Sequence, residues 1–304
     1  MTAPERKTRC GFVAVLGAPN AGKSTLVNRL VGAKVSIVSP KVQTTRTRVT
    51  AIGMAGDAQI VFLDTPGIFQ APRKRLERAM IDAAWRSAAD ADVLLLVVDA
   101  SRKRVDDDTR RILDALKEKG RTAVLALNKI DLVKKETLLA KADQLFASGA
   151  ISEVFMISAT EGDGVDGLKA HLAGAVPEGP WHFPEDQLTD MPERLLAAEI
   201  TREQVFLRRY QELPYAIAVE TESWEEFKDG SAKVSQAIYV ERDSQRPIVL
   251  GKGGATIKAI GESARKELEE ILGRRIHLML RVKQRGDWSE SRELYRDWGL
   301  EFEA

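Results

Sequence analysis

The sequence predicts an α/β domain with a mostly parallel sheet, followed by a smaller α+β domain. Short apolar runs typical of buried strands alternate with helical stretches from about residue 10 to 175. Three prolines within the eight residues 177–184 then interrupt this alternation, and a different order of elements follows. We therefore predict a first domain at residues 1–176, an extended linker at 177–192 and a second domain at 193–304.

The elements of the first domain follow from runs bounded by turn residues. Strands are predicted where apolar residues are continuous, at residues 12–16, 59–63, 93–98, 123–127 and 154–157. Helices are predicted from residue 24, at 76–89, at 107–119 and at 168–175. Polar motifs follow four of these strands, at the edge where open parallel sheets bind ligands.

Composition describes an ordinary globular chain of 304 residues, with 44% hydrophobic and 30% charged residues. The single cysteine, Cys10, forms no internal disulfide, which fits a reducing compartment. The polar N-terminus lacks a signal-peptide core, and no apolar stretch approaches the roughly 18 to 20 residues that span a bilayer. We therefore expect a cytoplasmic protein. The net charge is +1, so any nucleic-acid surface is expected to be a local patch.

The first motif runs from Gly17 to Thr25 and fits the phosphate-binding pattern G-x-x-x-x-G-K-[ST] between a strand and a helix. Its glycines let consecutive N–H groups point at phosphate oxygens, and the helix N-terminus adds positive charge. We expect Lys23 to reach the β- and γ-phosphates and the Ser24 hydroxyl to ligate Mg²⁺. The predicted phosphate site comprises Gly17, Ala18, Pro19, Asn20, Ala21, Gly22, Lys23, Ser24 and Thr25.

The other three motifs complete a guanine-nucleotide site. Asp64 ends a predicted strand, where its carboxylate is expected to hold Mg²⁺ through water and the Gly67 N–H to meet the γ-phosphate. A carboxylate at Asp131 accepts two hydrogen bonds from guanine, and adenine offers no such donor pair. The predicted residues of these motifs are Asp64, Thr65, Pro66, Gly67 and Ile68, then Asn128, Lys129 and Asp131, and then Ser158, Ala159 and Thr160.

The second domain reads as a helix at 193–211, strands at 215–220 and 232–241, an apolar strand at 248–250, a glycine loop, a helix to 272 and a strand at 276–282. This order resembles a KH domain whose β-hairpin precedes the GxxG loop, a module that clamps about four nucleotides. We expect RNA contacts at Gly251, Lys252, Gly253, Gly254, Lys258, Arg281 and Lys283. For the last two, a solvated strand edge is the alternative. Trp224, Trp288 and Trp298 either stack bases or pack in the core, and core packing is favoured.

A nucleotide domain joined through a proline-rich linker to a KH-like domain resembles the bacterial Era family of GTPases. The similarity covers roughly residues 8–300 and includes the words Gln43-Thr-Thr-Arg46, Pro-Glu-Gly-Pro at 177–180, Thr-Asp-Met-Pro at 189–192 and Tyr-Val-Glu-Arg at 239–242. The resemblance implies binding of GTP, its hydrolysis to GDP, and Mg²⁺. It further implies recognition of the 3′ region of 16S ribosomal RNA and a role in maturing the 30S subunit.

The resemblance also assigns catalytic residues. In related GTPases the loop matching Gln43-Thr-Thr-Arg46 supplies a threonine that meets Mg²⁺ and the γ-phosphate only in the GTP state; we predict Thr45, with Thr44 as the alternative. Ile68 stands where signalling GTPases carry a water-orienting glutamine, so slow hydrolysis is expected. Some relatives bind K⁺ through the asparagine that matches Asn20. The predicted catalytic set is Asn20, Lys23, Thr45 and Gly67.

The leading hypothesis is therefore a monomeric GTP-hydrolysing switch that binds ribosomal RNA. An RNA-binding adaptor whose nucleotide site does not turn over is the alternative that Ile68 supports. A membrane-associated signalling GTPase is the third alternative. The lack of a lipidation motif or a long basic helix leaves room only for weak peripheral association.

Overall fold

The computed structural model describes residues 7–41, 44–69, 72, 74–208, 217–286 and 288–302. The chain divides into two compact units. The first unit comprises Met1–Ser36, Thr45–Asp190 and Gly299–Ala304, and the second comprises Ile37–Thr44 and Met191–Trp298. The first is an α/β unit and the second an α+β unit, which confirms the predicted fold class.

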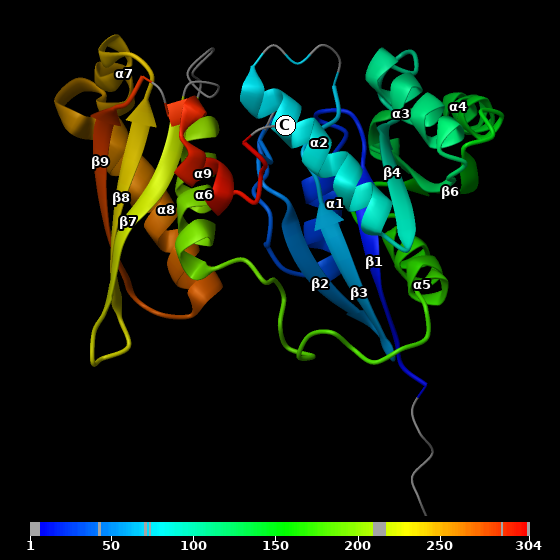
Figure 1. The fold of residues 1–304 in the computed structure, drawn as a ribbon, viewed down its shortest axis with the longest axis horizontal. Coiled ribbons are helices and arrows are strands. Elements are labelled where there is room, and N and C mark those ends of the chain that lie inside the picture. The colour runs from blue at the N-terminus through cyan, green and yellow to red at the C-terminus, as the bar shows by residue number, and fades with distance from the viewer. Residues whose placement is uncertain are drawn as a thin grey trace, which may run out of the picture. The chain divides into compact units, whose positions relative to one another are not determined.

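The first unit is built on a six-stranded sheet in the order β2-β3-β1-β4-β5-β6 (Figure 1). β2 runs antiparallel to β3, and the other neighbours are parallel, which agrees with the predicted mostly parallel sheet. β3 is buried along its whole length, as expected for a strand covered on both faces. The strands are β1 (Arg9–Leu16), β2 (Val49–Ala55), β3 (Ala58–Asp64), β4 (Val93–Asp99), β5 (Ala123–Asn128) and β6 (Ile151–Ile157).

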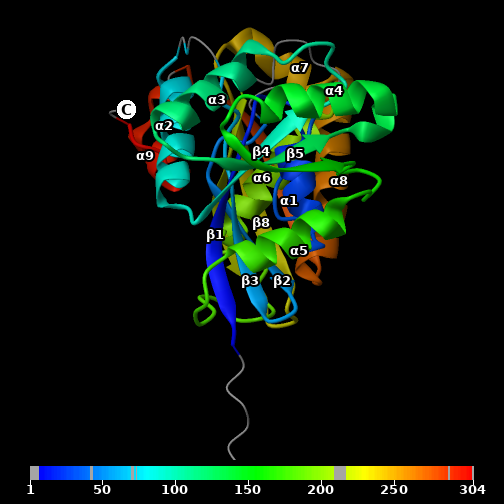
Figure 2. The ribbon, with the colours of Figure 1, turned by 90° about the vertical axis from the view of Figure 1, so that its right-hand side faces the viewer.

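Helices cover both faces of this sheet (Figure 2). α1 (Lys23–Val31) and α5 (Val165–Ala175) pack on one face, where Val13 and Val15 of β1 point. α2 (Arg75–Asp90), α3 (Asp107–Glu118) and α4 (Lys135–Phe146) pack on the other, with Ala14 and Leu16. The alternation along β1 is the period of two expected of a strand. A 3₁₀ turn, η1 (Ile130–Leu132), follows β5.

Residues 177–190 form an extended segment that belongs to the first unit. The buried Gln59 side chain holds it, because its Oε1 accepts hydrogen bonds from the backbone N–H groups of His182 (2.9 Å) and Phe183 (3.0 Å). Near its end, the Thr189 hydroxyl donates to the Thr50 carbonyl at 2.7 Å. The segment is thus anchored to β2 and β3 by side-chain hydrogen bonds.

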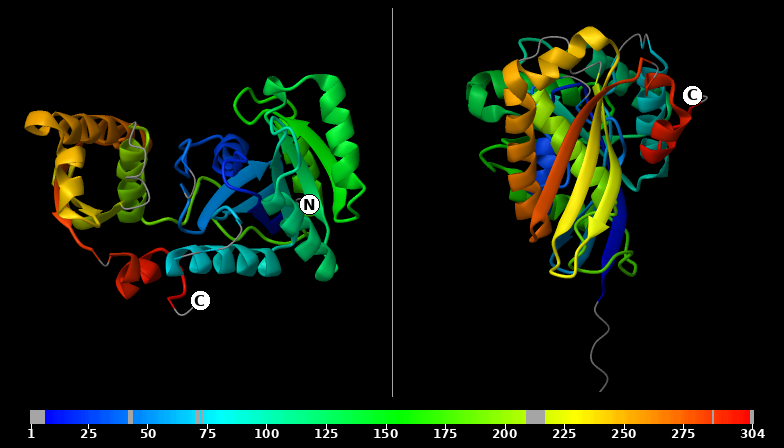
Figure 3. Two further views of the ribbon diagram at one scale, coloured as in Figure 1. Left: turned by 90° about the horizontal axis from the view of Figure 1, so that it is seen from above. Right: turned by 90° about the vertical axis from the view of Figure 1, so that its left-hand side faces the viewer.

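The second unit contains a three-stranded sheet in the order β7-β8-β9, visible in the right-hand view of Figure 3. β7 (Ile217–Glu226) and β8 (Ala232–Val240) are antiparallel, and β9 (Ile276–Gln284) runs parallel to β8. α6 (Glu193–Phe206) and α8 (Ala255–Leu272) pack on one face of the sheet around Val219, Ile238 and Val282. The shorter helices are η3 (Asp243–Gln245), α7 (Arg246–Leu250), η4 (Lys252–Gly254), η5 (Trp288–Glu290) and α9 (Arg292–Asp297).

The strand predicted at 248–250 is wrong, because these residues belong to helix α7. Pro247 occupies the first turn of this helix, where its fixed φ and missing N–H are tolerated. Val249 is fully buried while Ile248 is exposed, so only one side of the apolar run faces the core. The helix predicted at 193–211 ends at Phe206, and residues 209–211 lie outside the described part of the chain. Strand β2 and helices α4 and α9 were not predicted.

No helix within the described ranges is long and apolar enough to cross a membrane.

Candidate functional site

Four predicted motifs lie at one edge of the six-stranded sheet. They follow β1, β3, β5 and β6, which are mutually parallel, so their carboxyl ends share that edge. The chain crosses from β3 on one side of β1 to β4 on the other. A crevice outside the carboxyl ends at such a reversal is where open α/β sheets bind ligands.

The loop between β1 and α1 has the geometry of a phosphate cradle. Gly22 precedes α1 with a φ of 95°, a conformation that favours glycine. A Cβ on Gly22 would lie 2.3 Å from Nδ2 of Asn128, so the close approach admits no side chain. Asn20 also has a positive φ, of 62°. Thr25 lies in the first turn of α1, partly buried. The loop therefore presents backbone rather than side chains to a ligand.

Lys23 is buried against its own loop. Its Nζ donates to the carbonyl oxygens of Gly17 (3.0 Å) and Ala18 (3.1 Å). Burial lowers the pKa of Lys23 to about 8, and the charge of Asp64 opposes this effect. A lysine with a pKa this close to neutrality gains charge when anionic phosphates approach it.

Asp64 is fully buried and accepts hydrogen bonds from two hydroxyl groups, with a third hydroxyl next to one of them. Its Oδ2 accepts hydrogen bonds from Ser24 Oγ (2.7 Å) and Ser36 Oγ (2.8 Å), and Ser24 Oγ is 2.9 Å from Thr45 Oγ1. Burial raises the pKa of Asp64, against the lowering effects of Ser24, Lys23 and Ser36. Among the described residues, its Oδ1 has no hydrogen-bond partner. An orphaned buried carboxylate oxygen beside hydroxyls is an oxygen donor set that fits Mg²⁺.

The two threonines of the predicted switch differ in position. Thr45 lies beside Ser24, whereas the Thr44 hydroxyl donates to the Lys41 carbonyl (2.7 Å) and is 2.6 Å from Ser39 Oγ. The structure thus brings Thr45, rather than Thr44, to the Asp64 group. Gln43 lies outside the described residues. Ser36 was not singled out from the sequence, because a lone serine in the loop after α1 carries no motif.

Asn128 joins the phosphate loop to the fourth motif. Its Nδ2 donates to the Ala21 carbonyl at 2.9 Å, and its Oδ1 accepts from the Ala159 N–H at 3.0 Å. Lys129 Nζ donates to the Asn20 carbonyl (2.8 Å) and to Asp99 Oδ2 (2.6 Å). Burial would raise the pKa of Asp99, but hydrogen bonds from Lys129 and a neighbouring serine hold this pKa below its ordinary value. The motif that begins at Asn128 is therefore held against the loop between β1 and α1.

The remaining predicted residues lie near Lys23, Asp64 and Asn128 in the same site. Asp131 is exposed in η1, and the Ser158 and Thr160 hydroxyls are 3.2 Å apart. The Thr65 hydroxyl donates to the Val15 carbonyl at 2.7 Å, which fixes the start of the second motif beside β1. Ile68 donates its backbone N–H to the Gly17 carbonyl at 3.2 Å.

The segment around Gly67 is packed tightly against the phosphate loop. A Cβ on Gly67 would lie 3.0 Å from backbone atoms of Pro19, and Pro66 beside it is buried. The Ile68 side chain is buried in the core cluster that includes Leu16. It therefore faces apolar neighbours and has no group that orients water by hydrogen bonding.

In the second unit, the glycine loop connects α7 to α8. Gly251 has a φ of 72°, and a Cβ there would lie 2.0 Å from Thr256 Oγ1. Gly253 and Gly254 also have positive φ and open space around their Cα atoms. Two adjoining grooves, of about 410 and 430 Å³, follow α8 and β9 and share Arg265, Leu278 and Met279. Lys258 lines the groove nearer the glycine loop.

Arg281 and Lys283 lie on the opposite face of β9. Val282, which stands between them in the sequence, is buried under the helices, so Arg281 and Lys283 point to the other face. Lys283 forms an ion pair with Glu222 of β7. Their assignment as RNA ligands stays a prediction. Trp288 and Trp298 are buried and pack edge to face, which confirms core packing for these two tryptophans.

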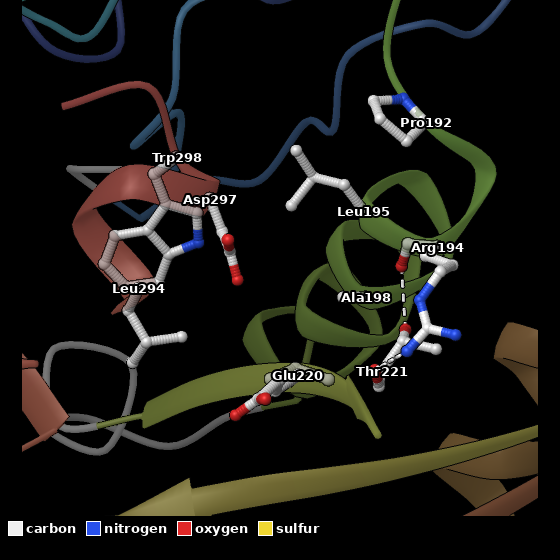
Figure 4. A pocket seen from close by; sticks show the side chains of 10 residues that line it. Pro192, Arg194, Leu195, Ala198, Glu220, Thr221, Leu294, Asp297 and Trp298 are labelled. Atoms are coloured by element: carbon white, nitrogen blue, oxygen red, sulfur yellow. Dashed lines mark hydrogen bonds between the residues drawn. The ribbon is translucent and has the colours of Figure 1, made fainter. Parts of the chain in front are cut away.

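A hollow of about 400 Å³ lies between α6, β7 and α9 (Figure 4). Arg194 and Thr221 bind each other reciprocally at its rim. Arg194 Nη2 donates to the Thr221 carbonyl (2.8 Å), and the Thr221 hydroxyl donates to the Arg194 carbonyl (2.7 Å). The carboxylates of Glu220 and Asp297 also line the hollow. No sequence motif indicated it.

Comparison with known proteins separates the same two parts of the chain. The model of the 50S ribosome-binding GTPase family matches residues 12–129, and the KH domain model matches residues 212–289. The protein called GTPase Era from Caulobacter vibrioides is 54% identical over the full length of both chains. The chain belongs to the Era GTPase family. The Era proteins of Rhizobium meliloti (57% identity, 97% of this chain and 94% of that one) and Maricaulis maris (52%, 97% and 98%) are similarly close.

Two solved Era structures match the fold with a TM-score of 0.90 and 38% identity, over 96% of this chain and 99% of theirs. One is an Aquifex aeolicus Era variant bound to GDP·AlF₄⁻. The other is an Era in complex with MgGDPNP and nucleotides 1506–1542 of 16S ribosomal RNA. The predicted family, the fold class of a P-loop GTPase domain followed by a KH domain, and the GTPase activity are confirmed.

Proposed function

We propose that this Era-family GTPase is a slow, GTP-dependent switch. In the GTP state it would bind the 3′ region of 16S ribosomal RNA and act in 30S subunit biogenesis and rRNA maturation. The observation that carries this proposal is the groove along α8 and β9 beside the glycine loop, in a chain whose Era relative binds 16S RNA together with MgGDPNP. KH modules clamp about four nucleotides at such a loop.

The nucleotide site supports defined roles for its residues. Lys23 and the N–H groups of residues 17–25 bind the phosphates, Ser24 and Thr45 ligate Mg²⁺, and Asp64 holds it through water. When bound, Mg²⁺ neutralises charge on the β- and γ-phosphates. Asp131 selects guanine, while Asn128 and the motif at 158–160 hold the base-binding edge together. The orphaned Oδ1 of Asp64 is the strongest support for the metal.

The position of Ile68 supports slow hydrolysis, because its side chain lies in the apolar core. A long-lived GTP state suits a switch. Asn20 lies in the phosphate loop, where a K⁺ ion bound by its side chain would take the charge-neutralising place of an arginine finger. Equal hydrolysis rates in K⁺ and Na⁺ buffers would refute the role of K⁺.

The RNA groove is tested by two lysine variants, one on helix α8 in the groove and one on strand β9 on the face of the sheet away from the helices. We would measure the affinity of a single-stranded RNA of the 16S 3′ sequence in GDPNP and in GDP, over a range of salt. Lys258→Ala is expected to weaken binding and to lower the salt slope by about 0.7, the value for one phosphate contact on a single strand. Lys283→Ala tests the opposite face, where Lys283 is paired with Glu222.

A third variant blocks the groove sterically. A Cβ on Gly261 would lie 3.4 Å from Leu280 Cδ1, so Gly261→Leu fills the floor of the groove. We expect it to abolish RNA binding while GTP hydrolysis by the first unit continues. Gly174→Leu, on α5 with open space around its Cα, is the matched control. Undiminished RNA binding by Gly261→Leu, or equal RNA affinity in GDPNP and GDP, would contradict the proposal.

We also propose that the protein acts as a monomer in the cytoplasm, where ribosomal subunits mature, with at most weak peripheral attachment to the membrane. Flotation with anionic vesicles tests the attachment, since strong recovery with lipid in physiological salt would contradict it. Light scattering at micromolar concentration tests the monomeric state.

A further inference from the structure

A short stretch of chain, Ile37–Thr44, belongs to the second unit although its neighbours on both sides belong to the first. Ile37 is buried in a cluster with Leu196 and Ile200 of α6. The Val38 N–H donates to Glu203 Oε1 of the same helix at 2.6 Å. Residues 42–43 lie outside the described part of the chain. The described residues of this stretch are therefore fixed to α6 by apolar packing and hydrogen bonding.

Arg202 makes the second attachment, at the end of the stretch. Its Nη2 donates to the Thr44 carbonyl at 2.5 Å, and its Nε donates to Glu199 Oε1 at 2.8 Å. The Arg202 side chain is 1% exposed, so the guanidinium and its carboxylate partner are a buried pair. Among the described residues, Nη1 of Arg202 has no hydrogen-bond partner. The guanidinium also lies over the Phe206 ring, 4.9 Å from its centroid, so it is fixed from several sides.

The attachment bears directly on Thr45. The Thr44 carbonyl and the Thr45 N–H belong to one planar peptide group, so holding the oxygen orients the start of Thr45. The Thr45 hydroxyl is 2.9 Å from Ser24 Oγ, which donates to Asp64. At the other end of the stretch, Ser36 Oγ also donates to Asp64, at 2.8 Å. The residues that flank the stretch thus lie at the Asp64 carboxylate, Ser36 through a direct hydrogen bond and Thr45 through Ser24.

We infer that Arg202 of α6 is a positioning residue for Thr45 in the GTP-bound state. This inference rests on the proposed role of Thr45 at Mg²⁺ and the γ-phosphate. Arg202, held by Glu199, fixes the peptide group before Thr45, and Thr45 in turn completes the oxygen set around Ser24 and Asp64. Because Thr45 is needed only when a γ-phosphate is present, loss of Arg202 acts on the GTP state and spares the GDP state.

The test variant is Arg202→Lys. Lysine keeps the charge beside Glu199, but its ammonium lacks the planar fork that serves the carboxylate and the Thr44 carbonyl together. Arg194→Lys is the matched control, since Arg194 lies on the same helix and donates to the carbonyls of Thr221 and Glu222 in β7. For both variants we would measure kcat and KM, and the Mg²⁺ dependence of GDPNP and GDP binding.

In Arg202→Lys we expect kcat to fall roughly ten-fold, the effect of losing one hydrogen bond to a charged group. The Mg²⁺ concentration for half-maximal GDPNP binding is expected to rise by a similar factor, and GDP binding to stay unchanged. Arg194→Lys should match the unmodified protein in all of these measurements. Equal weakening of GDPNP and GDP, or no change in either, overturns the inference.

Two further variants distinguish failure of this inference from failure of the proposed function. Glu199→Gln keeps one acceptor for Arg202 and nearly the same shape, so a smaller effect, again confined to GDPNP, is expected where Arg202→Lys fails to fold. Thr45→Ala tests the proposed function itself. If Thr45→Ala loses Mg²⁺-dependent GDPNP binding and neither Arg202→Lys nor Glu199→Gln does, the inference is overturned and the proposed function stands. If Thr45→Ala has no such effect, the proposed role of Thr45 fails, and the inference with it.

Discussion

Binding of nucleotide should take up protons through Lys23. Burial lowers the pKa of this lysine to about 8, with Asp64 opposing the shift. Bound phosphates place negative charge beside Nζ and raise the pKa of Lys23 above its value in the free protein, so that the lysine is protonated in the complex. The protonated lysine therefore binds nucleotide more tightly, and affinity falls as the pH rises above the pKa of the free protein.

The size of the proton uptake and of its effect on Kd follows from the Lys23 pKa of about 8. At pH 7.5 about one quarter of the free protein carries a neutral Lys23, and at pH 8.5 about three quarters does. Binding GDP therefore takes up about 0.25 proton at pH 7.5 and about 0.75 at pH 8.5, and Kd rises about three-fold between them. With an ordinary lysine pKa of about 10.4, the uptake and the change in Kd would both be negligible.

Isothermal titration calorimetry in buffers of different ionisation enthalpy measures the proton uptake directly. Lys23→Arg is the control, because arginine stays protonated at both pH values and any uptake that remains comes from another group. A Kd for GDP that is the same at pH 7.5 and 8.5, or an uptake that Lys23→Arg retains in full, would refute the reasoning.

Three further predictions concern buried groups. Asn128→Ala leaves the Ala21 carbonyl and the Ala159 N–H buried without their partner, so urea unfolding should show a loss of roughly 2–5 kcal/mol; a loss below 1 kcal/mol would mean that water replaces the side chain. Trp288→Ala removes a side chain that is 1% exposed, and the free energy of unfolding should fall by about 3–5 kcal/mol, whereas an unchanged urea midpoint would contradict its place in the core. Asp64→Asn should raise the melting temperature without Mg²⁺, because burial raises the pKa of Asp64 and the folded protein loses stability as the pH rises above about 4 and this carboxyl ionises. Adding MgGDP should then stabilise the unmodified protein more than the variant, and a variant that melts lower than the unmodified protein at pH 7 without Mg²⁺ would contradict this prediction.

Much of the nucleotide site was predictable because its motifs are local. The glycines, the lysine and the serine of the phosphate loop follow one another within a single loop directly after a strand. Their relative positions are therefore set by the local backbone. Gly22 shows why this works, since its φ of 95° and its contact with Asn128 leave no room for another residue. Apolar runs likewise indicated the strands that bring the motifs to one edge of the sheet.

Features that depend on contacts between distant segments were not predictable. Ser36 carries no motif, and only the fold brings its hydroxyl to Asp64. The apolar run at 248–250 suits a strand as well as a buried helix, and Pro247 was the signal that favoured a helix start. Arg202 belongs to no sequence motif. Only the folded structure shows that its side chain is buried and bonded to the Thr44 carbonyl.

The attachment of Ile37, Val38 and Thr44 to α6 has a thermodynamic consequence if the protein is the proposed RNA-binding switch. If GTP binding favours one position of this stretch, GTP binding also changes the free energy of the second unit, because the second unit is bonded to the stretch. RNA bound to the second unit in its favoured state must then raise the affinity for GDPNP by the factor by which GDPNP raises the affinity for RNA. The reciprocity applies to binding constants and not to kcat, so the two affinities form a closed cycle. If the hydrogen bond from Arg202 to the Thr44 carbonyl carries this coupling, both factors should shrink together toward one in Arg202→Lys.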